Sequence, residues 1–190
     1  MSVNRDRPHV LVLPEDQAKR EIVNGFIRNT PVDQRRIQVL KNLGGWKRVC
    51  EEFENVYVPK LNENQNSYVV MLIDFDGRPE RRSQMERLIP EDLRDRAFVI
   101  GALSQPEKLK ADTRLTFEEI GRELEEDCPR QPDGIWTHEL LKHNAAELDR
   151  MWKTLGPILL PSKADIRTAQ EPSTRTVGSV DSGEIGQGQQ

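Results

Sequence analysis

The segment Ser67–Gly77, with the sequence SYVVMLIDFDG, restricts the fold of this chain more than any other segment. Its apolar and β-branched residues end abruptly at Asp74 and Asp76, and a glycine follows. An apolar run without alternation is typical of a strand that is buried on both faces, as in a parallel sheet. Open α/β sheets bind ligands beyond the carboxyl ends of their strands. Two carboxylates at that place suit Mg²⁺, which prefers a few hard oxygen ligands and keeps several waters.

A second segment, His9–Ile27, repeats this arrangement. It begins as an apolar strand, reaches Glu15 and Asp16, and continues with apolar residues at helical spacing. Because the carboxyl ends of parallel strands meet at one edge of a sheet, we expect Glu15 to lie near Asp74 and Asp76. The set predicts a shared metal or phosphate chemistry. The alternative is that each acid only caps or begins a helix, where the macrodipole favours negative charge.

The remaining pattern predicts strands that alternate with helices. Strands are expected at residues 9–14, 56–59, 67–74 and 96–103, and helices at 16–28, 33–54, 81–88, 107–110, 117–128 and 136–155. Thr116 and Glu119 have the spacing of a capping box at the start of one of these helices. The alternation favours a three-layer α/β fold with a central, mostly parallel sheet of about four strands, followed by C-terminal helices.

Length and composition predict one domain, over about residues 8–161. Residues 162–190 are dominated by Gly, Ser, Thr and Gln without apolar periodicity, so they are predicted to be a disordered tail. The formal net charge of −4 gives no global field that would attract nucleic acid. A local basic group follows the acidic loop, however, and makes Arg78, Arg81 and Arg82 the candidates for contact with nucleic acid.

Cysteine usage and hydropathy predict a cytoplasmic protein that does not bind membranes. The two cysteines have no CxxC spacing, and the histidines are scattered, so no zinc site is expected. Nothing resembles a signal peptide, and no apolar run has the length that would span a bilayer. A reduced compartment fits this pattern.

The acids at the strand ends resemble those of the Toprim domain, the catalytic fold of topoisomerases, primases and OLD-family nucleases. Glu15, in LPEDQAKREIV, takes the place of the family's glutamate after the first strand, although Asp16 stands where the family usually has glycine. The family's D-x-D motif is matched by Asp74-Phe75-Asp76. OLD-like members carry another acid after the next strand, which Glu107 could supply. The resemblance covers about residues 9–110.

This resemblance implies metal-assisted phosphoryl transfer on nucleic acid, in the manner of a nuclease, with Mg²⁺ or Mn²⁺ as cofactor. The carboxylates that it implies as metal ligands are Glu15, Asp74, Asp76 and Glu107. Glu15 would also act as the acid or base, and Lys108 or Arg78 would stabilise the charge of the transition state. Some OLD-like nucleases act beside a partner ATPase, so such a partner is a further expectation.

Three other functions fit parts of the same pattern. A receiver-like phosphoacceptor domain would use Asp74 as acceptor, with Glu15 and Asp16 as its acidic pocket and Ser104 as its hydroxyl residue. A haloacid-dehalogenase-like phosphatase would use IDFDG as its nucleophile motif, but Pro79 stands where that family has Thr or Val, and a strand–helix unit precedes the motif. A non-catalytic interaction module is the third alternative. Whether the chain is an enzyme therefore stays open at this stage.

Overall fold

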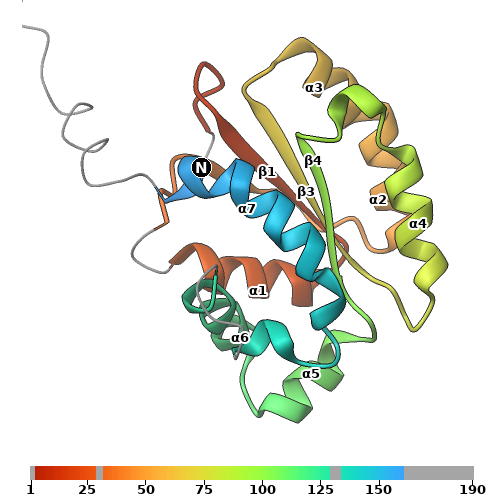
Figure 1. The fold of residues 1–190 in the computed structure, drawn as a ribbon, viewed down its shortest axis with the longest axis vertical. Coiled ribbons are helices and arrows are strands. Elements are labelled where there is room, and N and C mark those ends of the chain that lie inside the picture. Colours follow the sequence, from red (N-terminus) through yellow and green to blue (C-terminus); the bar gives the residue numbers. More distant parts are fainter. Residues whose placement is uncertain (1–2, 29–31, 129–133, 161–190) are drawn as a thin grey trace, which may run out of the picture.

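The computed structural model describes residues 3–28, 32–128 and 134–160, and it has the predicted α/β architecture (Figure 1). Four parallel strands form one sheet in the order β2-β1-β3-β4. These strands are β1 (His9–Pro14), β2 (Ile37–Val39), β3 (Ser67–Asp74) and β4 (Ala97–Ala102). The helices are α1 (Gln17–Arg28), α2 (Trp46–Glu52), α3 (Val58–Glu63), α4 (Pro79–Leu88), α5 (Pro106–Thr113), α6 (Phe117–Glu126) and α7 (Ala145–Leu159). The predicted tail, residues 162–190, lies outside the described residues.

The sheet lies between two layers of helices, so the predicted three-layer arrangement is confirmed. Helices α2, α3 and α4 cover one face, and α1, α6 and α7 cover the other (Figure 1). Strand β3 is buried on both faces, as its composition predicts. Val69 and Met71 pack in the cluster under α2 and α4, whereas Val70 packs in the cluster under α1 and α7.

The strand order has a topological switch point between β1 and β3. The chain leaves β1 toward β2 on one side and leaves β3 toward β4 on the other, so the order reverses between the two central strands. Such a switch point opens a crevice at the carboxyl ends of the strands, where α/β proteins bind ligands. Glu15 follows β1 directly, and Asp74 ends β3.

Two of the elements predicted between β1 and β3 in the sequence are wrong. The second strand is β2 at Ile37–Val39, within the predicted helix 33–54, and no strand exists at 56–59. A three-residue strand is too short to show alternation in the sequence. The run 56–59 looked like a strand because of its β-branched residues, but a helical stretch continues from Trp46 to Glu63 through a π-helical segment, Phe53–Tyr57. Its core face repeats every four residues, at Val49, Phe53, Tyr57 and Leu61.

Helices α1 and α6 approach each other closely through two glycines. A Cβ on Gly25 would lie 2.0 Å from the carbonyl oxygen of Glu118, and a Cβ on Gly121 would lie 1.9 Å from that of Ile22. No other residue fits at either position without a shift of the backbone. The predicted capping box of α6 is present, with Thr116 and Glu119 bonded reciprocally.

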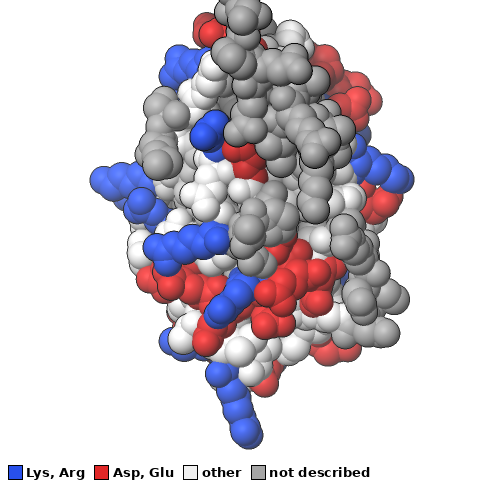
Figure 2. Space-filling model, turned by 90° about the vertical axis from the view of Figure 1, so that its left-hand side faces the viewer, with Lys and Arg blue, Asp and Glu red and all other residues white. Residues whose placement is uncertain are grey.

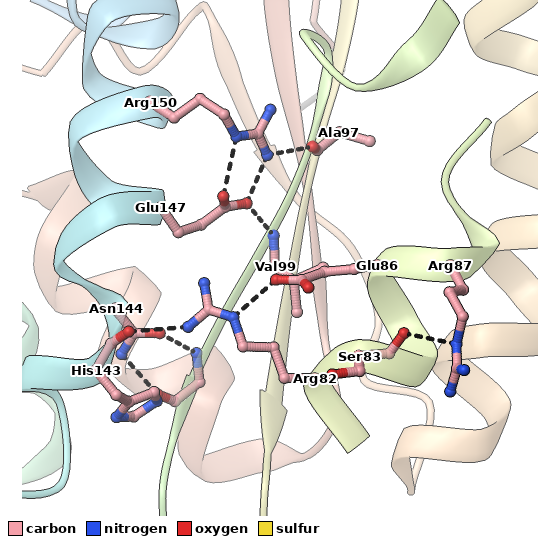
Figure 3. A network of polar contacts seen from close by, with 11 residues as sticks. Arg82, Ser83, Glu86, Arg87, Ala97, Val99, His143, Asn144, Glu147 and Arg150 are labelled. Atoms are coloured by element: carbon pink, nitrogen blue, oxygen red, sulfur yellow. Dashed lines mark hydrogen bonds and ion pairs between the residues drawn. The ribbon is translucent and has the colours of Figure 1, made fainter. Parts of the chain in front are cut away.

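The closing region differs from the single helix predicted over 136–155. Two 3₁₀ turns, Ile135–Thr137 and Lys142–Asn144, precede α7. Side chains at three-residue spacing then bond to the outer edge of β4, as Figure 3 shows. Asn144 bonds to both backbone groups of Gly101, the Val99 N–H donates to Glu147 at 2.9 Å, and Arg150 donates to the Ala97 carbonyl at 2.9 Å. These side chains take the place of a fifth strand, so this edge is closed.

Candidate functional site

The structure brings the predicted acids of β1 and β3 together through Glu15. The backbone N–H of Asp74 donates to Glu15 Oε2 at 2.7 Å, and the N–H of Trp46 donates to Oε1 at 3.0 Å. The Glu15 carboxylate therefore ties the end of β3 to the start of α2. Because both of its oxygens accept backbone hydrogen bonds, Glu15 serves here to position these two elements.

Asp74 forms a buried ion pair with Lys19, which sequence reasoning missed. The Lys19 ammonium contacts Asp74 Oδ2 and lies 2.8 Å from Asp16 Oδ2. The side chains of Lys19 and Asp74 are only 6% and 8% exposed. The sequence contains a signal for the burial of Lys19. It precedes Ile22 and Val23 by three and four residues, so it lies on the apolar face of its helix. A lysine on an apolar helical face needs a buried partner.

Asp16 directly precedes α1, and its carboxylate bonds both to the first turn of the helix and to the Lys19 ammonium. Its Oδ1 accepts the backbone N–H of Lys19 at 3.0 Å, which is the hydrogen bond of a helix N-cap. Its Oδ2 accepts the ammonium of the same residue. The capping interpretation of Asp16 is therefore right, and the same side chain also reaches the cation at Asp74.

The surroundings of Asp74 change its acidity. Burial raises the pKa of Asp74 from 3.8 to about 7, Lys19 opposes this rise, and the negative charges of Glu15 and Asp16 add to it. A carboxyl group with such a pKa exchanges its proton near neutral pH. Perturbed carboxyl groups at a sheet crevice are typical of functional sites.

Asp76 points to a different cation. Its carboxylate lies 2.6 Å from Arg81 Nη1, which also donates to the backbone carbonyl of Asp74 at 3.0 Å. The guanidinium packs over the Trp46 ring, 5.2 Å from its centroid. Asp76 has a left-handed backbone, with φ 48°, and Gly77 follows with φ 67°. Aspartate tolerates this conformation better than most residues do, which explains an acid at this turn.

The Asp74–Asp76 loop collects buried polar atoms that have no hydrogen-bond partner. Among the described residues these atoms are Asp74 Oδ1, Arg81 Nε and both ring nitrogens of His143. Arg81 bonds to the loop, and the His143 ring packs edge-on against Phe75 at a centroid distance of 5.3 Å. Burial lowers the pKa of His143, and the charge of Arg82 adds to this effect. Unpaired buried polar groups are rare in native proteins and often mark catalytic or ligand sites.

The other predicted site residues lie outside this cluster. Glu107 and Lys108 are exposed in the first turn of α5, and Arg78 is exposed at the start of α4. Arg82 bonds to Glu86 at 2.8 Å and to the His143 carbonyl at 3.0 Å. Within the described residues, no three His, Cys, Asp or Glu side chains form a group that could hold a metal ion. The described part of the chain thus offers individual carboxylates at the switch point and no preformed group of three metal ligands.

One face of the molecule shows basic and acidic side chains side by side. Figure 2 shows the face on the left of Figure 1, where Lys and Arg are interspersed with Asp and Glu, and where acids gather in the lower half. Of the arginines predicted to contact nucleic acid, Arg81 pairs with Asp76 and Arg82 pairs with Glu86, whereas Arg78 is exposed. Within the described part of the chain, no helix is both long and apolar enough to cross a membrane.

Comparison with models of protein families, with curated proteins and with solved structures finds no match to this chain. The assignment of a function therefore rests on the geometry at the ends of β1 and β3.

Proposed function

We propose that this protein is a divalent-metal-dependent phosphoryl-transfer enzyme that cleaves nucleic acid, with Asp74 and Asp76 at its centre. One observation carries the proposal. Asp74 lies buried at the switch point of the sheet, where Lys19 holds Oδ2 while Oδ1 has no partner. A buried carboxylate oxygen without a partner is costly, and a cation or an acidic proton at that oxygen would remove the cost. The resemblance of Asp74-Phe75-Asp76 to the Toprim motif agrees with this function.

The donors at the site fit Mg²⁺ or Mn²⁺ bound together with a substrate. Mg²⁺ is commonly held by one or two carboxylates plus substrate phosphates, and it keeps several waters. Asp74 supplies one free oxygen, and the carboxylate of Asp76, which is exposed but pairs with Arg81, follows on the same loop. Such a site needs no third protein ligand. Because Oδ1 of Asp74 is buried, we expect the metal to bind weakly without substrate.

The residues around Asp74 would have different roles in the reaction. When bound, the metal would polarise the phosphate and activate water. Arg81, held over Trp46, has an unpaired Nε–H and would stabilise negative charge on the phosphate. Glu15 would keep β3 and α2 in place, since both of its oxygens accept backbone N–H groups. This positioning role replaces the acid–base role that the resemblance implied for Glu15.

The test is cleavage of plasmid, single-stranded DNA and RNA in the presence and absence of millimolar Mg²⁺ or Mn²⁺. The wild type should cleave only with metal, and Asp74→Asn and Asp76→Asn should each lose about a hundredfold in rate. Asp92→Asn is the matched control, because Asp92 is exposed in the 3₁₀ turn Glu91–Leu93. A wild type that cleaves none of these substrates with either metal would refute the proposal.

A second candidate function is that of a receiver-like phosphoacceptor, and the Asp16–Lys19–Asp74 contacts favour it. The order β2-β1-β3-β4 equals the first four strands of the flavodoxin-like order. Ser104 lies two residues beyond β4, at the same edge of the sheet. In this function Asp74 would accept a phosphoryl group beside Lys19. Incubation with a small phosphodonor should then add one phosphate to the wild type and none to Asp74→Asn, with no nuclease activity.

A further inference from the structure

We infer that the Lys19 ammonium occupies the position of a divalent cation between Asp16 and Asp74, and that metal and ammonium exclude each other there. This inference rests on the proposed function, and it adds Asp16 as a ligand and Lys19 as the group that sets the affinity. The sequence motifs give Lys19 no role, and they give Asp16 only as a helix cap or as part of a receiver-like acidic pocket.

The geometry shows two carboxylates that already converge on one positive charge. The Lys19 Nζ lies 2.8 Å from Asp16 Oδ2 and contacts Asp74 Oδ2. Two carboxylate oxygens from different elements thus already contact a single cation. Mg²⁺ and Mn²⁺ bind hard carboxylate oxygens at slightly shorter distances, about 2.1 Å for Mg²⁺, so a small inward movement of the two side chains would suffice.

A second observation points to a ligand at the same place. Asp74 is almost fully buried, and its Oδ1 has no partner although Oδ2 is bound to Lys19. The Lys19 ammonium contacts Oδ2 of Asp74, but its other N–H groups do not reach Oδ1. A metal ion with its waters presents more donors and a higher charge. The carboxyl group is therefore incompletely satisfied while Lys19 is the only cation on it.

The lysine also opposes a metal electrostatically. A divalent ion next to an ammonium in a buried site is repelled, and burial weakens the screening of this repulsion. Metal entry then requires the ammonium to leave. Removal of the Lys19 charge should leave this position free for the metal and so increase the metal affinity. Removal of an exposed lysine should leave the metal affinity unchanged.

The experiment is titration with Mn²⁺ alone, with free Mn²⁺ measured from its electron paramagnetic resonance signal. Lys19→Met keeps the unbranched side chain and removes its charge. We expect this variant to bind Mn²⁺ at least about tenfold more tightly than the wild type. The gain should vanish in Asp16→Asn/Lys19→Met. Lys153→Met, which changes an exposed lysine on α7, is the matched control and should bind like the wild type.

Folding is checked in parallel by thermal melting with and without Mn²⁺. If Lys19→Met does not fold without metal, Lys19→Gln keeps a polar group at the site and serves as the second variant. Equal or weaker Mn²⁺ binding in both lysine variants overturns the inference. The same experiments distinguish this inference from the proposed function. If Lys19→Met binds Mn²⁺ more tightly but the wild type cleaves no nucleic acid, the competition between metal and ammonium is supported and the nuclease function is refuted.

Discussion

Replacement of Asp74 by asparagine should change how the stability of the protein depends on pH. Burial raises the pKa of Asp74 from its ordinary value of 3.8 to about 7, so the folded state prefers the neutral carboxyl group. Its contribution to stability is complete below the unfolded pKa and is lost as pH rises through the folded pKa. Each pKa unit corresponds to about 1.4 kcal/mol, which gives a loss of about 4 kcal/mol between about pH 4 and pH 8.

Urea unfolding of both proteins across this pH range, with a chelator present, measures the effect. Asp74→Asn cannot ionise, so the unfolding free energy of the wild type should fall relative to it by up to about 4 kcal/mol as pH rises. A constant offset between the proteins is expected, because the asparagine leaves Lys19 with Asp16 alone. Only the change with pH counts, and Asp92→Asn should follow the wild type. Parallel curves for the wild type and Asp74→Asn would refute the reasoning about this carboxyl group.

Three further substitutions test the elements around the site. Glu15→Gln removes one of two acceptors for backbone N–H groups and should cost about 1–3 kcal/mol in urea unfolding, and an unchanged midpoint would deny its positioning role. Gly121→Ala places a Cβ 1.9 Å from the Ile22 carbonyl oxygen and should cost about 1–3 kcal/mol or more, which thermal melting would show and a stable variant would disprove. Asn144→Ala leaves both backbone groups of Gly101 unpaired at the outer edge of β4. It should destabilise the fold and promote self-association, which size-exclusion chromatography would show. A variant that stays a stable monomer would show that Asn144 is not needed to close this edge.

The sequence predicted the parts of the fold whose residues carry a strong local signal. Strand β3 is confirmed because Val69 to Ile73 are apolar without a break, and a fully buried parallel strand needs that composition. The proximity of Glu15 to the end of β3 also followed from the sequence, since parallel strands end at one edge. The capping box at Thr116 and Glu119 depends only on local spacing, and it is present.

Other features depend on contacts that no local pattern contains. Strand β2 is three residues long, and it exists because β1 offers it an edge. The Lys19–Asp74 pair joins residues 55 positions apart, and only the fold decides which acid meets the buried lysine. The pairing of Asp76 with Arg81 likewise depends on the turn after β3. The sequence predicts a metal site of four carboxylates because it gives their positions after the strands. It does not give the directions in which their side chains point.

Metal-dependent cleavage of nucleic acid by the wild type, beside Asp74→Asn and Asp92→Asn, tests the central claim most directly. The account predicts cleavage by the wild type and by Asp92→Asn with Mg²⁺ or Mn²⁺, none after chelation, and about a hundredfold slower cleavage by Asp74→Asn. Cleavage that Asp74→Asn retains at the wild-type rate, or a wild type that is inactive with both metals, would contradict it.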